Sequence, residues 1–124
     1  MSRDEIRVRA VRGAIRVPED TPEAVLGATE RLLRELLHRN AIASEDIVSI
    51  FFTATEDLAA AFPAEAARRM GLGAVPLMCA REIPVRGSMP RVIRILLHFH
   101  TARHQREIVP VYLDGAESLR DDLG

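Results

Sequence analysis

Apolar and polar residues follow one another along the chain in patterns that predict five strands and two helices. Five segments are rich in β-branched and other apolar residues, which is typical of strands: 6–17, 47–55, 74–85, 90–100 and 106–113. The segment 19–40 instead repeats its apolar residues at helical spacing. A shorter helix is expected within 62–71, where it follows a proline and ends at a glycine.

The long helical segment carries its own start and stop signals. Thr21 can cap the first turn, Pro22 fits the first helical position, and Asn40 marks the end. Pro76 favours a sheet edge for its strand. The order β-α-β-α-β-β-β predicts an α+β (α/β) domain in which two main helices cover one face of a mixed sheet. The other face would remain apolar and uncovered, and oligomerisation would cover it.

Length and composition indicate a single domain and the cellular compartment in which it lies. The chain has 124 residues and is 48% hydrophobic, which suffices for a single core and a single domain over 1–124. The lone Cys79 excludes an intramolecular disulfide and favours a reducing cytoplasm. The amino terminus is too charged for a signal peptide, and no uncharged stretch approaches the roughly 20 residues that span a bilayer. We expect a soluble cytoplasmic domain with no membrane partner.

The charges argue against nucleic acid as a partner and point to anions. Net charge is −1 and aromatic residues make up only 4% of the chain, so nucleic-acid binding is not expected. All 17 basic residues are arginine. Arginine binds carboxylates through two parallel hydrogen bonds, so any anion site here would be built from guanidinium groups.

Four polar residues interrupt the apolar strands: Arg12, Glu82, Arg94 and Tyr112. Arg94 lies in an otherwise apolar run, and burying a guanidinium costs on the order of several kcal/mol unless an anion meets it. That anion could be Glu82, in an internal ion pair. It could also be a small ligand with two carboxylates, since two arginines and a tyrosine beside one glutamate leave excess positive charge. Gly13, next to Arg12, leaves space for another group to approach.

Other catalytic chemistries lack their sequence signals. His98, His100 and His104 lie at a strand end without an adjoining acidic ligand, which favours surface histidines over a metal site. Cys79 has no histidine near it in sequence, so a structural cysteine, or one that offers its backbone to a ligand, is favoured over a nucleophile. No phosphate loop, dinucleotide fingerprint or His-Glu metal motif occurs, and we expect no cofactor and no metal.

The chain resembles the monofunctional chorismate mutases of the trimeric AroH class. The resemblance runs from about Val11 to Leu123 and rests on VRGAIRVPEDTPE, TATEDLAAAFPAEAAR, PLMCAREIPVRGSMPRVIR, and VYL followed by LRDDL. It implies a homotrimeric pseudo-α/β-barrel with three active sites in clefts between subunits. It also implies the conversion of chorismate to prephenate, a step toward phenylalanine and tyrosine.

The resemblance implies roles for the interrupting polar residues. Arg12 and Tyr112 match residues that hold a substrate carboxylate. Glu82 matches the acceptor for the ring hydroxyl, with Cys79 beside that hydroxyl. Arg94 matches the residue at the ether oxygen. These roles suit an intramolecular rearrangement, which needs a held geometry and a fixed donor for growing negative charge, but no proton transfer and no covalent intermediate.

Six further residues match family positions. Phe62 and Arg68 match residues that come from the adjoining subunit, and Leu77 and Met78 match residues of the pocket wall. Leu119 and Arg120 match residues of a tail (about 114–124) that partly covers the site. Three positions depart from the usual family pattern: Glu65, Met78 and Pro110.

Two rival interpretations share the trimeric architecture. One is a catalytically silent small-molecule-binding trimer. The other is an enamine/imine deaminase-like trimer, which also has an arginine at its subunit clefts. The spacing of Glu82 and Arg94 favours the mutase over both.

Overall fold

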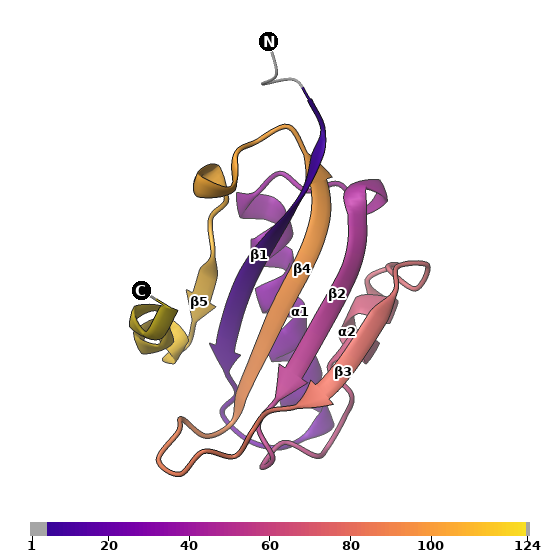
Figure 1. Cartoon of the computed structure of the whole chain (residues 1–124). Helices are drawn as coiled ribbons and strands as arrows, with labels where there is room; N and C mark the ends of the chain where they lie inside the picture. Colours follow the sequence, from indigo (N-terminus) through magenta and orange to yellow (C-terminus); the bar gives the residue numbers. More distant parts are fainter. Residues whose placement is uncertain (1–4, 124) are drawn as a thin grey trace.

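The computed structural model describes residues 5–123 and is built on one five-stranded sheet (Figure 1). The strands are β1 (Arg7–Arg16), β2 (Ile47–Ala54), β3 (Leu77–Arg81), β4 (Val92–Thr101) and β5 (Val111–Leu113). The helices are α1 (Pro22–Arg39) and α2 (Ala64–Arg69). Three 3-10 helices complete the elements: η2 (Ser44–Asp46), η3 (Gln105–Glu107) and η4 (Ala116–Leu123).

The sheet is mixed, as the order of elements predicted. Its strand order is β3-β2-β4-β1-β5. The central strand β4 runs antiparallel to β1 and β2, whereas the outer pairs β2–β3 and β1–β5 are parallel. The edge position of β3 confirms the expectation drawn from Pro76, which cannot donate a backbone hydrogen bond. Both main helices lie on the same side of the sheet (Figure 1).

Helix α1 begins and ends where its capping residues predicted. The Thr21 side chain accepts a hydrogen bond from the backbone N–H of Ala24 at 3.1 Å, and Asn40 is the C-terminal cap. The apolar stripe of the helix is fully buried against the sheet at Leu32, Leu33 and Leu36. Within the described residues, no helix has both the length and the apolar character needed to cross a bilayer.

Gly13 allows α1 to pack closely on β1. A Cβ atom at Gly13 would lie 2.9 Å from the carbonyl oxygen of Val111, 3.0 Å from Cδ1 of Leu32 and 3.2 Å from Cδ1 of Leu36. The space next to Arg12 is therefore filled by the protein's own helix and by β5. The glycine contributes to the fold rather than opening a path for a ligand.

The last strand is shorter than predicted. The pattern indicated a strand over 106–113, but η3 occupies its beginning and β5 starts only at Val111. The buried Asn40 side chain accepts a hydrogen bond from the N–H of Val109 at 2.7 Å and donates one to its carbonyl oxygen at 2.9 Å. Pro110 has no N–H to donate. The backbone before Val111 therefore satisfies its polar groups outside the sheet.

The face of the sheet opposite the helices, called the open face below, is only partly covered. Side chains on a strand alternate between faces, and the helix-facing residues of β4 are buried. The open face exposes four large apolar residues: Val8, Phe51, Met78 and Leu96. This confirms the prediction of an uncovered apolar face. Its β5 end is covered by η4, where Ala116 and Leu119 are buried against Ala14 and Val92.

Replacing Gly13 by alanine should destabilise the fold by about 1–3 kcal/mol, as expected for overpacking. The Val111 carbonyl can withdraw only by disturbing the pairing of β1 with β5. The matched control is Gly27→Ala on the exposed side of α1, where a Cβ meets nothing within 4 Å. It should stabilise the protein by about 0.5–1 kcal/mol. Urea unfolding at equal protomer concentration measures both; equal stability of the two variants would refute this account of Gly13.

Candidate active site

An ion pair between Arg94 and Glu82 lies on the open face. Nε of Arg94 donates a hydrogen bond to Oε2 of Glu82 at 2.9 Å, and the hydroxyl of Thr53 donates to the same oxygen at 2.7 Å. Thr53 on β2 is the register partner of Arg94 on β4. Glu82 follows β3, and its backbone N–H bonds to the carbonyl oxygen of Ala54 at 3.0 Å. Residues from three neighbouring strands thus meet at one carboxylate.

The sequence left open whether the anion that meets Arg94 is a protein carboxylate or a ligand. In this structure it is Glu82 of the same chain. The Glu82 side chain is 17% exposed and the Arg94 side chain 39% exposed. Glu82 is therefore largely withdrawn from water and needs both of its donors. Only Nε of Arg94 is engaged, and no residue in the described part of the chain bonds to its Nη atoms. The guanidinium retains donors for a ligand.

Register places Arg12 and Tyr112 on the same face as this pair. Ala14 on β1 is paired with Arg94 on one side and with Tyr112 on the other. Tyr112, Ala14, Arg94 and Thr53 therefore form one row across the sheet, and Arg12 lies on the same face, two residues before Ala14. Arg12 is exposed, and the described residues give it no hydrogen bond or ion pair. This face thus carries four cationic or hydroxyl donors, of which Arg94 and Thr53 bond to the carboxylate of Glu82.

The tail borders this row at its β5 end. Leu119 of η4 is buried in a small apolar cluster against which Tyr112 also packs. Arg120 is exposed. The structure thus brings part of the tail next to the polar row.

The β3 residues divide between the two faces of the sheet. Met78 is the register partner of Phe51 and is exposed on the open face. Leu77 and Cys79 point to the other face, where both pack against the main core. The side chain of Cys79 is thus separated by the sheet from that of Arg94. One subunit does not bring these residues together.

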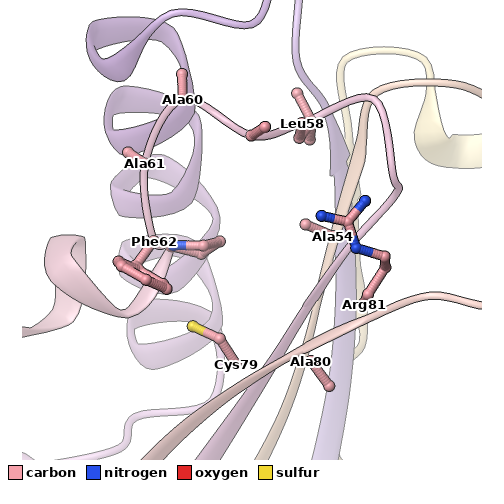
Figure 2. Close-up of a pocket in the computed structure, with 10 residues that line it drawn as sticks. Ala54, Leu58, Ala60, Ala61, Phe62, Cys79, Ala80 and Arg81 are labelled. Atoms are coloured by element: carbon pink, nitrogen blue, oxygen red, sulfur yellow. The ribbon is translucent and has the colours of Figure 1, made fainter.

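Phe62 and Arg68 also lie away from the ion pair. Phe62 is 74% exposed in the loop before α2, and Arg68 on α2 pairs with Glu65 at 3.0 Å. The loop borders an open cavity of about 410 Å³, and the sulfur of Cys79 points toward it (Figure 2). The ring of Phe62 has no other aromatic side chain beside it in this cavity wall, half of whose residues are alanine.

The histidines of β4 are not gathered into a metal site. His98 lies 3.4 Å from the hydroxyl of Ser49 and edge-on to the ring of Phe51. Over residues 5–120, no three histidine, cysteine or carboxylate side chains are grouped so as to hold a metal ion.

Thr53 is the one residue of this cluster that the sequence did not indicate. It lies in an apolar strand as an ordinary β-branched residue, 29 positions before Glu82. Only the pairing of β2 with β4 brings its hydroxyl to the carboxylate.

Comparison with known proteins identifies the family. The family model for chorismate mutase type I matches residues 8–123. Chorismate mutase AroH of Thermus thermophilus is 54% identical over 117 residues, which cover 94% of this chain and 96% of that protein. Chorismate mutase AroH of Bacillus subtilis (strain 168) is 38% identical over 117 residues, 94% of this chain and 92% of the relative.

A solved structure leads to the same family. Chorismate mutase from Clostridium thermocellum Cth-682 superposes with a TM-score of 0.87 at 44% sequence identity, over 88% of this chain and 97% of that chain. The family model and these relatives match nearly the whole length of the chain. The chain belongs to the type I chorismate mutase family.

Proposed function

We propose that this protein is a chorismate mutase whose active site is centred on the Arg94–Glu82 pair. The observation that carries the assignment of the site is the geometry of Arg94. Its Nε is held by Glu82, while its Nη atoms have no partner among the described residues and face the same side as Arg12 and Tyr112. Family membership supports the reaction itself.

The reaction needs few chemical groups. A C–O bond of chorismate breaks while a C–C bond forms, so the protein has no proton to move and no covalent bond to make. Negative charge grows on the ether oxygen as the bond breaks. The Nη groups of Arg94 meet that charge, and the pairing of Nε with Glu82 orients them before the substrate arrives.

The positive charge that remains suits a carboxylate of the substrate. Glu82 already neutralises one arginine, which leaves Arg12 with its full charge for a carboxylate, and Tyr112 adds a hydroxyl donor from the same face. Together they hold the flexible enolpyruvyl arm over the ring. The second oxygen of Glu82, Oε1, accepts a hydrogen bond from the ring hydroxyl.

We infer that the site is completed by an adjoining subunit in a homotrimer. Phe62 and Arg68 lie away from the ion pair of their own chain, and the exposed ring of Phe62 is accessible to a neighbouring chain. The apolar open face also requires a cover. Phe62 and Arg68 would then face the neighbour's polar row, with Leu77, Met78 and Cys79 at the wall between the subunits. The single cysteine favours a cytoplasmic location.

The reaction is tested by adding the purified protein to chorismate and following the loss of its ultraviolet absorbance. We expect turnover without added metal or cofactor. Binding without turnover would instead indicate the catalytically silent trimer.

Arg94→Lys should lower kcat at least about 10²–10³-fold, since losing one preorganised donor typically costs about 2.7–4 kcal/mol. Lysine keeps the charge but loses the planar fork, so it cannot hold Glu82 and the ether oxygen together. KM should change less, because the contact strengthens only as the bond breaks. Steady-state kinetics and thermal melts measure the effects, with Arg34→Lys in the exposed Glu30 pair as the control. A collapsed melting temperature with unchanged kcat per folded trimer would make Arg94 purely structural.

Mixed trimers should reveal a site shared between subunits. Arg94→Ala and Arg68→Ala should each lose most activity alone. Refolded together in equal amounts, they should regain activity, because about one site in four then takes both wild-type residues from different chains. Light scattering confirms the trimer mass. No recovery in mixtures of proven trimeric mass would place the whole site within one chain.

Leu119→Ala should raise KM several-fold and change kcat less. The smaller side chain leaves η4 undocked from Ala14 and Val92 for more of the time, so the tail closes the site less often. Its exposed neighbour supplies the control, Ser118→Ala. An unchanged KM for Leu119→Ala would remove the tail from the site.

A further inference from the structure

The carboxylate of Glu82 is held asymmetrically. Nε of Arg94 and the hydroxyl of Thr53 both donate to Oε2, at 2.9 and 2.7 Å. No residue in the described part of the chain bonds to Oε1. The contact with Arg94 therefore uses one carboxylate oxygen and one guanidinium nitrogen. Arginine and carboxylate commonly form two parallel hydrogen bonds instead.

Thr53 is placed to maintain this arrangement. It lies on β2, directly opposite Arg94, and its branched side chain has few rotamers. Its hydroxyl bond is short and made to a charged acceptor, which strengthens it. Because Oε2 is tied to β2 as well as to β4, the carboxylate cannot turn freely to bring both oxygens onto the guanidinium.

We propose that Thr53 is a positioning residue for the mutase reaction. Its hydroxyl keeps the Glu82–Arg94 pair in the one-oxygen arrangement, so that Oε1 of Glu82 stays available to the ring hydroxyl and the Nη groups of Arg94 stay available to the ether oxygen. Without the hydroxyl, Glu82 would take a second hydrogen bond from Arg94 and occupy a donor that the transition state needs. This inference rests on the proposed function and extends it to a residue with no direct contact to substrate.

The decisive variant is Thr53→Val, which has almost the same shape and suits a strand but lacks the hydroxyl. We expect kcat/KM to fall about 10–100-fold, as for the loss of other groups that orient an active-site residue. Most of the loss should lie in kcat, while trimer mass and melting temperature hold, since a second hydrogen bond from Arg94 would replace the one lost from Thr53. Thr53→Ser restores the hydroxyl and should recover most of the activity. Thr101→Val removes a hydroxyl at the far end of β4, where it accepts a hydrogen bond from the N–H of Arg103, and should keep the wild-type kcat/KM.

A double-mutant cycle shows whether Thr53 acts through Glu82. In the Glu82→Gln background, Thr53→Val should cost only a small part of what it costs in the wild type, because the group that it positions has been removed. An equal loss in both backgrounds would mean that Thr53 acts independently of Glu82 and would overturn the inference. So would wild-type kcat in Thr53→Val. Should the valine variant fail to assemble, Thr53→Ala removes the same hydroxyl and carries the same expectation.

The wild-type assay separates this inference from the function on which it rests. If the wild-type protein does not convert chorismate, the proposed function fails and the role of Thr53 fails with it. If it does convert chorismate and Thr53→Val is equally active, only the role of Thr53 is refuted.

Discussion

The ion pair between Arg94 on the central strand and Glu82 organises the proposed site. Arg94 meets Glu82 through one nitrogen, and Thr53 shares the same carboxylate oxygen. A largely buried carboxylate with only one donor would be costly, and a guanidinium with all its donors engaged could not bind a substrate. The arrangement avoids both conditions. The protein thereby holds a charged donor in place without exhausting its hydrogen-bonding capacity.

The hydrophobic core and the polar residues of the proposed site lie on opposite faces of the sheet. The helix-facing side carries the core, and Gly13 lets α1 pack against it. The open face carries Arg12, Arg94 and Tyr112 among exposed apolar residues. A single chain can therefore form its core while the residues of the proposed site lie on both sides of its sheet. The proposed site would combine the open face of one chain with the loop and α2 of a neighbour, because these segments lie on the opposite side of their own sheet.

Local signals in the sequence predicted most elements for reasons that the structure confirms. The cap at Thr21, the end of α1 at Asn40 and the edge strand at Pro76 depend on backbone chemistry within a few residues. The last strand was overpredicted because its early backbone bonds to Asn40, 69 residues away in sequence. Local propensity cannot include such a partner.

The sequence by itself determined which residues alternate on each strand, and it singled out Arg94 and Glu82 as two charges needing partners. Its motifs also indicated the family that the comparisons show. Only the tertiary structure decided that these two residues pair, that Thr53 joins them, and that Cys79 faces away. The physical reason is strand register: the alternation of side chains along a strand is local, but the rows across a sheet depend on how distant strands pair.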